Sequence, residues 1–361
     1  MKKLFIAVAL PLSLWGWSRS GRGIEAIYAD GFYPLVAPLL QGATGLVPFD
    51  VFEWGVVAAL GWLVVHTLRV RRIGLGAWAR RLVLVLGALT TWFLVAWGVH
   101  YGRATLPVQQ GWTVDERVRG KPSRGEIAAL TTAMHRELLA RWDDLGPLAS
   151  ATGSTNPHTL PELAAAIDRG YGQLDWVHYA PVRTWSSARP KRVLFLFKLF
   201  PTAGMYSPWT GEAQIDVDLP DGHTGFTACH ELAHSRGYAR ENEANLLGYA
   251  ACKASGDPYL RYSGALAGYR YLRGAARKTH PEVVAGLNQR LPEGIKADIE
   301  KGRQWARGKP QWSSMLSDIT YDAYLKSQGV HDGSVSYGRV VRLLVQLRRA
   351  GLLALEGDTP S

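Results

Sequence analysis

The pattern of hydrophobic and polar positions divides the chain into an apolar first third and a mixed remainder. Leu82–Val99 is an uncharged run of 18 residues, and Val51–Leu68 is of similar length with one acid near its start. Each would form a helix of about 27 Å, close to the thickness of the hydrocarbon core of a bilayer. Leu4–Trp17 is shorter and follows two lysines, and no clean signal-peptidase pattern comes after it. We therefore expect three membrane spans, at about residues 4–17, 51–68 and 82–99.

The residues between the first two spans are apolar but broken. Residues 31–49 contain no charged side chain and three prolines, which disfavour one continuous spanning helix. We expect an interfacial or re-entrant segment there.

The arginines near the spans predict the orientation of the chain. Residues 69–81 carry five arginines and no acid, whereas the loop between the first two spans has more acids than arginines. Because loops rich in arginine and lysine stay in the cytoplasm, the amino terminus and residues 69–81 should lie inside. Everything after Val99 should then lie outside the cytoplasmic membrane.

The remainder of the chain alternates between patterns typical of strands and of helices. The expected elements are an extended tether at 103–112, helices at 123–142 and 161–168, a buried strand at 192–199, an edge strand at 212–219, and mostly helical structure from there to Ala350. We therefore predict an α+β protein. Transmembrane helices in residues 1–100 should precede a mostly helical domain with a small sheet in residues 101–361.

Composition and charge narrow the function classes. Of 361 residues, 47% are hydrophobic and 20% charged, which is too apolar for disorder. The net charge is +11, but nine cations and four anions of the membrane region supply +5 of it, and no basic stripe interleaved with aromatic residues follows. We therefore expect no nucleic-acid partner. Two cysteines exclude a four-cysteine zinc site; Cys229 and Cys252 could form a disulfide bridge or remain two buried thiols.

The chemistry is concentrated in a HExxH motif at residues 230–234. On a helix, His230 and His234 are four residues apart and project from one face, so both imidazoles can reach one metal ion. Glu231 is rotated by about 100° from His230, beside the metal rather than on it. From there it can act as general base on a metal-activated water.

The residues after the motif supply candidates for a third ligand. Gly237 should end the helix and allow the chain to turn back, and a second helix should begin near Arg240. Glu241 and Asn245 share a face of that helix, whereas Glu243 lies about 200° around it from Glu241. We expect Glu241 to be the third ligand and Asn245 to support a ligand histidine, with Glu243 a weaker candidate for supporting the site. The alternative is that both glutamates are solvated or salt-bridged.

Two resemblances follow from these residues. HExxH followed by Glu241-Asn242-Glu243-Ala244-Asn245 is similar to the pattern of gluzincin-type zincins, whereas Arg240 replaces the third histidine of metzincins. A longer resemblance, to the bacterial membrane family of unknown function DUF3810, rests on GMYSPWTGEAQIDV, FTACHELAHSRGYARENEANLLGYAAC and YDAYLKSQGVHDGSVSYGRVV. It implies a zincin-like domain anchored in the bacterial cytoplasmic membrane.

The zincin resemblance also implies roles around the site. The edge strand at 212–219 could pair with an extended peptide substrate, although an ordinary sheet edge would look the same. Tyr206 and Tyr337 are candidates to stabilise an oxyanion. We expect His223 to be a cap or surface residue rather than a ligand.

We therefore expect a membrane-anchored zinc metallopeptidase that acts on a peptide or protein outside the membrane. Zn²⁺ would be held by His230, His234 and Glu241, with Glu231 as general base. One alternative is a zinc-stabilised binding or assembly protein without catalysis, and another is a zinc hydrolase that cleaves a cell-wall amide. The substrate, the biological process and the oligomeric state stay open at this point.

Overall fold

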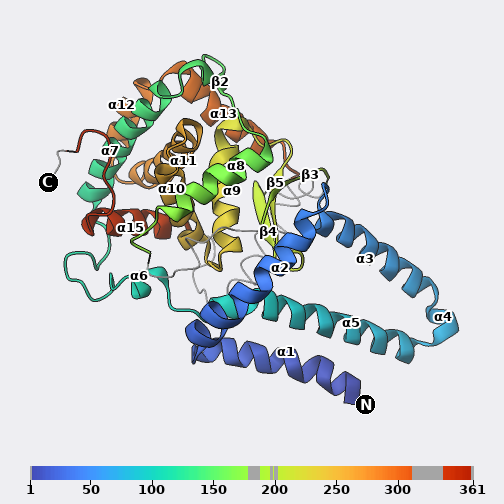
Figure 1. Cartoon of the computed structure of the whole chain (residues 1–361). Helices are drawn as coiled ribbons and strands as arrows, with labels where there is room; N and C mark the ends of the chain where they lie inside the picture. The colour runs from blue at the N-terminus through green and yellow to red at the C-terminus, as the bar shows by residue number, and fades with distance from the viewer. Residues whose placement is uncertain (1, 178–187, 196–197, 199–201, 311–335, 359–361) are drawn as a thin grey trace.

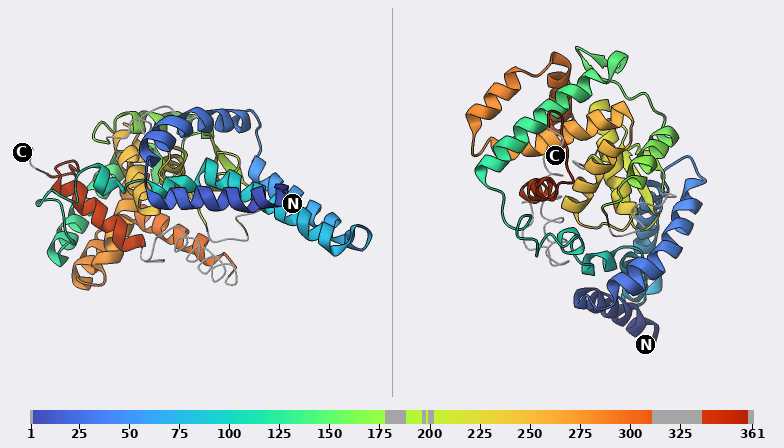
Figure 2. Two further views of the ribbon diagram at one scale, coloured as in Figure 1. Left: turned by 90° about the horizontal axis from the view of Figure 1, so that it is seen from below. Right: turned by 60° about the vertical axis from the view of Figure 1, so that its left-hand side comes forward.

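Apolar helices leave one side of a larger helical domain. The computed structural model describes residues 2–177, 188–195, 198, 202–310 and 336–358. The first hundred residues, the expected membrane region, contain α1 (Lys2–Ser20), α3 (Val51–Leu68), α4 (Val70–Ile73) and α5 (Leu75–Ala96). Among the described residues, α3 and α5 are long and apolar enough to cross a membrane. In Figures 1 and 2 the amino terminus and α4 both lie away from the helical domain, and α1 packs along α5.

The arginine-rich loop is shorter than the sequence predicts. Arg80 and Arg81 lie inside α5, which begins at Leu75. Arginine is a good helix former, and no helix breaker separates these residues from the apolar run that follows. The third apolar helix also ends at Ala96, and a 3₁₀ helix, η2, covers Gly98–Gly102.

The segment expected to be too broken to span a membrane as one helix, residues 31–49, is helical over most of its length. A π-helix, η1 (Ile24–Phe32), leads directly into α2 (Tyr33–Gly45). Pro34 is tolerated because it occupies the first turn, where a backbone N–H has no helical partner. Tyr33, Ala37 and Gln41 are spaced four residues apart and form the buried face of α2.

The prediction of an extended tether at 103–112 is also wrong, because this segment belongs to the core. It contains a short helix, α6 (Leu106–Gln109), and both Leu106 and Trp112 are buried in the main hydrophobic cluster. The buried Arg103 forms an ion pair with Glu25, a partly exposed residue, with 3.0 Å between Nε and Oε2. Burying Leu106 and Trp112 stabilises this segment against the domain, which the polar residues around them did not indicate.

The domain is built from packed helices, as its sequence pattern predicts. Ser123 starts α7 with a reciprocal capping box to Glu126. The helices are α7 (Arg124–Asp143), η3 (Gly146–Leu148), α8 (Leu160–Gly172), α9 (Asp221–Ser235), α10 (Glu241–Ala254), α11 (Pro258–Ala276), α12 (Pro281–Gln289), α13 (Glu293–Arg307) and α15 (Ser336–Arg349). In the described part of the chain, α9, α10 and α11 pack on one another at the centre of the core (Figure 1).

Two small sheets complete the fold. A hairpin joins β1 (Ala149–Ser150) to β2 (Gly153–Ser154), and the second sheet has the order β3–β5–β4. Its strands are β3 (Pro190–Val193), β4 (Gly204–Ser207) and β5 (Glu212–Asp216).

The expected strands differ from these in two ways. The buried strand predicted at 192–199 begins and ends earlier, as β3. The strand predicted as an edge at 212–219 is the central strand β5, because β4 pairs antiparallel with it through a tight turn and takes the edge position. The edge nearest α9 is therefore formed by residues 204–207.

Candidate metal centre

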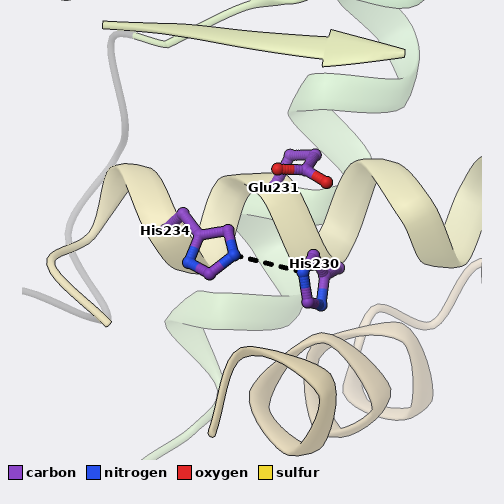
Figure 3. A group of neighbouring side chains, drawn as sticks. All are labelled: His230, Glu231 and His234. Atoms are coloured by element: carbon purple, nitrogen blue, oxygen red, sulfur yellow. Dashed lines mark hydrogen bonds between the residues drawn. The ribbon is translucent and has the colours of Figure 1, made fainter. Parts of the chain in front are cut away.

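The HExxH residues lie on α9, and both imidazoles project from one side of this helix (Figure 3). The Nε2 atoms of His230 and His234 are only 3.1 Å apart. Gly237, with φ +87°, occupies the left-handed conformation that turns the chain back toward α9 after the helix ends. The turn leads into α10, whose first residue is Glu241.

Glu241 closes the cluster from α10. Its Oε2 lies 3.2 Å from His230 Nε2, and its Oε1 lies 3.6 Å from His234 Nε2. A ligand atom of Glu231 also lies within 4.8 Å of both imidazoles, but the carboxylate of Glu241 reaches both Nε2 atoms directly. The two imidazoles and the Glu241 carboxylate therefore converge on one point, where a metal ion would fit.

A hydrogen bond to the backbone prepares His234 for a metal. Its Nδ1 lies 2.6 Å from the carbonyl oxygen of Tyr238, which can only accept, so Nδ1 carries the proton. In the neutral ring the lone pair is then on Nε2, which faces the other ligands. The Nδ1 of His230 is buried and has no hydrogen-bond partner among the described residues.

The charges in the cluster match what a cation would require. Although burial opposes ionisation, the His234 imidazole holds the pKa of Glu241 well below its usual range. Burial also lowers the pKa of His234, but Glu241 outweighs it and raises this pKa to about 9. In the metal-free protein a proton on His234 therefore takes the place that a metal ion would occupy next to the carboxylate.

Glu231 has the properties of a buried general base. Its side chain is 4% exposed, and its Oε2 has no hydrogen-bond partner among the described residues. The backbone of Tyr206 on β4 donates a hydrogen bond to the carboxylate. A Cβ at Gly204 would lie 2.6 Å from Oε1, so only glycine lets β4 come this close. Burial raises the pKa of Glu231 to about 7, while the two histidines act to lower it.

The other acid of this segment faces away from the metal centre. Glu243 is 2% exposed, and its Oε1 accepts a hydrogen bond of 2.9 Å from the backbone N–H of Leu106. Burial raises its pKa. Glu243 thus fastens the segment after the membrane region to α10.

Asn245 lies in the same cavity as the metal centre but does not have the partner expected from the sequence. Its Oδ1 accepts a hydrogen bond of 2.8 Å from the hydroxyl of Tyr271. Among the described contacts, no hydrogen bond joins it to a ligand histidine.

The two tyrosine candidates for an oxyanion site have different outcomes. The Tyr206 hydroxyl points toward α2, 3.3 Å from Gln41 Nε2 and 3.4 Å from the Tyr33 hydroxyl. Tyr206 therefore reaches the centre through its backbone. Tyr337 is the second residue of α15, but its side chain lies outside the described residues.

The prediction that His223 is a cap or surface residue is wrong, because its side chain is buried. It is 8% exposed, and its Nε2 lies 2.9 Å from the carbonyl oxygen of Asp298. Its Nδ1 consequently accepts a hydrogen bond of 2.9 Å from Arg270. Burial, with a smaller contribution from Arg270, lowers the pKa of His223 to about 4, so the ring is neutral at pH 7. It positions Arg270 at the wall of the cavity.

The cavity over the metal centre has a volume of about 780 Å³ and aromatic walls that the sequence analysis did not identify. Phe93 and Trp97, from the end of α5, line it together with Trp209. The rings of Trp97 and His234 are 5.5 Å apart, nearly perpendicular. The tryptophans near the end of the third apolar run were visible in the sequence, but nothing in their spacing connects them with residues more than a hundred positions away.

Cys229 and Cys252 are neighbours in the fold. Both are buried thiols, on α9 and α10, and their sulfur atoms are 3.0 Å apart. The pair joins the helix with the two histidines to the helix with Glu241.

Comparison with known proteins gives one match. A family model described as "Protein of unknown function (DUF3810)" matches residues 28–345, which include α2, the two helices long and apolar enough to cross a membrane, α3 and α5, and the candidate metal centre. No curated protein and no solved structure matches the chain.

Proposed function

The chain belongs to the DUF3810 family of proteins of unknown function, and we propose that it is a membrane-anchored zinc metallopeptidase. The observation that carries this proposal is the convergence of His230, His234 and Glu241. The Nε2 atoms of the histidines are 3.1 Å apart, and the carboxylate is within 3.6 Å of both. Glu231, the buried base, lies beside them on the same helix.

The donor set fits zinc. Two imidazole nitrogens and one carboxylate are typical of catalytic zinc sites, which leave a fourth position open. Among the described residues, no lysine or arginine forms an ion pair with Glu241, so its charge is balanced only by the histidines. A bound cation would balance it fully.

The chemistry of peptide hydrolysis would be shared between the metal and Glu231. Zinc, when bound, would supply Lewis acidity toward a water molecule and a peptide carbonyl. Glu231 would accept a proton from the water at its unpartnered Oε2 and then deliver a proton to the leaving amine. A pKa of about 7 allows the same carboxyl group to act as base and as acid near neutral pH.

An extended substrate would bind along β4 rather than along the strand expected from the sequence. Among the described strands, residues 204–207 form an edge of the sheet, and Thr202 to Tyr206 line the cavity that contains the two histidines. An edge strand offers unpaired backbone groups, with which an extended peptide can form main-chain hydrogen bonds. Its scissile bond would then lie between β4 and the metal centre.

The positions of the apolar helices support a location of the domain outside the cytoplasmic membrane. The amino terminus and α4, next to the arginine-rich residues, both lie on the side away from the domain (Figure 1). If this side is cytoplasmic, as the arginines predict, the metal centre faces the extracytoplasmic space. A reporter fused after Arg103 should then be active only outside the cytoplasm.

Purified full-length protein in detergent tests the proposed activity. We expect about one zinc per chain and cleavage of members of an unbiased peptide library. Glu231→Gln should keep the zinc and lose most of the turnover, by about 10² to 10⁴-fold, because only the base is removed. Zinc without turnover, on peptides and on cell-wall amides alike, would favour a zinc-stabilised binding protein instead.

A further inference from the structure

The outward face of α2 is apolar and has no covering among the described residues. On this face Leu35 is 71% exposed and Leu39 is 74% exposed, and Leu46, the residue directly after the helix, is 86% exposed. Residues 31–49 contain no charged side chain. On the inward face, the Tyr33 hydroxyl and Gln41 Nε2 donate hydrogen bonds to the carbonyl oxygen of Ser235, at 3.0 and 3.2 Å. One side of α2 therefore contacts Ser235, the residue after His234, and no described residue covers the other side.

This apolar face continues directly into a spanning helix. α3 begins at Val51, a few residues after Leu46. Its first backbone N–H groups, those of Val51 and Phe52, each donate a 3.0 Å hydrogen bond to Glu212 on β5. Lys191 on β3 donates to the carbonyl oxygens of Thr44 and Phe49 at 2.8 and 2.7 Å. α2 and the start of α3 are therefore fixed to the sheet that carries β4.

The other spanning helix ends in the wall of the cavity. Trp92 donates a 3.2 Å hydrogen bond to the carbonyl oxygen of Trp209, and the rings of Phe93 and Trp209 are 5.5 Å apart. Trp97 follows directly after α5 and contacts His234. Because tryptophan concentrates at the surface of the bilayer, the cavity wall begins where the hydrocarbon core ends.

We infer that the outward face of α2 lies in the bilayer surface and that the cleft takes the juxtamembrane segment of a membrane-anchored polypeptide. The inference rests on the proposed peptidase activity for its substrate class, and on the anchoring of α3 and α5 for its geometry. The bilayer is the occupant that fits, because the exposed leucines continue an apolar surface that α3 and α5 already place in lipid. A substrate segment far from the membrane would not reach a cleft held at that surface.

Site-directed fluorescence tests the contact with lipid. A polarity-sensitive fluorophore is attached at Leu39→Cys, and the full-length protein is reconstituted in vesicles that contain brominated phosphatidylcholine. The matched control is Val114→Cys, at a position that is 77% exposed and lies outside the membrane region; Cys229 and Cys252 are buried. Lipid should quench most of the fluorescence at residue 39 and little at residue 114. Equal, weak quenching at both positions would overturn the membrane-seated cleft.

A second experiment in the same vesicles tests the substrate class. Peptides with a randomised segment are anchored by a transmembrane helix, either directly or through a rigid helical spacer of about 20 residues, which adds about 30 Å. Directly anchored segments should be cut at least about tenfold faster than spaced ones. The spacer should prevent a peptide from staying in the bilayer and in the cleft at the same time, so the advantage of anchoring is lost. Equal rates would contradict the juxtamembrane substrate. Quenching at residue 39 without cleavage of any peptide would contradict the peptidase, and with it the substrate class, but not the contact with lipid.

Discussion

Two clusters of charged groups in this fold satisfy their charges in different ways. The docking cluster, which joins α3 to the sheet, consists of Asp50, Glu53, Lys191, Glu212 and Gln214. Glu212 receives the ammonium group of Lys191 and two backbone N–H groups, and Glu53 receives the backbone N–H groups of Leu194 and Phe195. Glu212 and Glu53 are thus neutralised or solvated by the protein itself, and Asp50 is partly satisfied: its Oδ1 accepts from Glu53 N–H and Gln214, whereas its buried Oδ2 has no partner among the described residues.

The metal centre differs because Glu241 contacts only imidazoles among the described residues. Glu241 contacts two histidines whose Nε2 atoms face each other at 3.1 Å, and Glu231 has an unpartnered buried oxygen among the described residues. Burying such a group costs stability unless something pairs with it. The comparison teaches that an acid paired with a lysine and backbone N–H groups fastens elements together, whereas an acid that faces only two convergent imidazoles, with no lysine or arginine paired to it among the described residues, indicates a metal site.

Removal of a ligand from the incomplete cluster should have the largest effect. His230→Ala, His234→Ala or Glu241→Gln should weaken zinc binding by more than about 100-fold, the upper range for changes to groups that only support ligands. Metal analysis of the purified variants and competition with a chelator measure this. If Glu241→Gln retains zinc at the level of the unmodified protein, the third ligand has been misassigned.

A change in the docking cluster should instead lower the stability of the protein without changing its zinc affinity. Glu212→Gln leaves Lys191 as a buried, uncompensated charge, which costs about 3–5 kcal/mol of unfolding free energy. Denaturant unfolding in detergent measures the loss, and zinc affinity should stay unchanged. Lys296→Gln is the control, since it breaks an exposed ion pair with Glu293 that is worth about 1 kcal/mol or less. A loss of zinc in Glu212→Gln would mean that the two clusters are coupled.

The pH dependence of zinc affinity should report on His234. Its pKa of about 9 in the metal-free protein means that zinc must displace a proton at any lower pH. Apparent affinity should therefore rise as the pH increases toward about 9, by at most about tenfold per pH unit, and level off above it. An affinity that stays flat between about pH 7 and 9 would show that His234 is already neutral without metal.

The smallest effect is expected at the acid that neighbours the third ligand. Glu243→Gln should leave zinc affinity nearly unchanged, because its carboxylate faces Leu106 and Arg240 rather than the histidines. A weaker hydrogen bond to the Leu106 N–H should lower stability by about 1 kcal/mol. Parallel titrations of Glu241→Gln and Glu243→Gln make the comparison, and equal zinc loss in both would contradict the assignment.

The sequence predicted the parts of the molecule that depend on local pattern. The apolar runs produced α1, α3 and α5, and the spacing in HExxH placed His230 and His234 on one face of α9. The separation of Glu241 and Glu243 also follows from helical geometry alone, and the structure directs them to different sides.

What the sequence did not predict depends on contacts between distant segments. β5 was expected at an edge because nothing local reveals that Gly204–Ser207 pairs beside it. The packing of residues 103–112 on α10, through Glu243, and of the helix α2 on α9, through the carbonyl oxygen of Ser235, was not visible in the sequence. Such tertiary contacts override local propensity and cannot be found from spacing within one segment.

The most direct test of the central claim compares new peptide termini in membranes that carry the unmodified protein or Glu231→Gln. The two proteins should hold equal zinc, since we propose that Glu231 is the base and not a ligand, so any difference isolates the chemical step. We predict that a set of termini appears only with the unmodified protein and that Glu231→Gln fails to complement a deletion strain. Identical termini together with full complementation by Glu231→Gln would contradict the peptidase and leave a zinc-stabilised binding protein as the account of this fold.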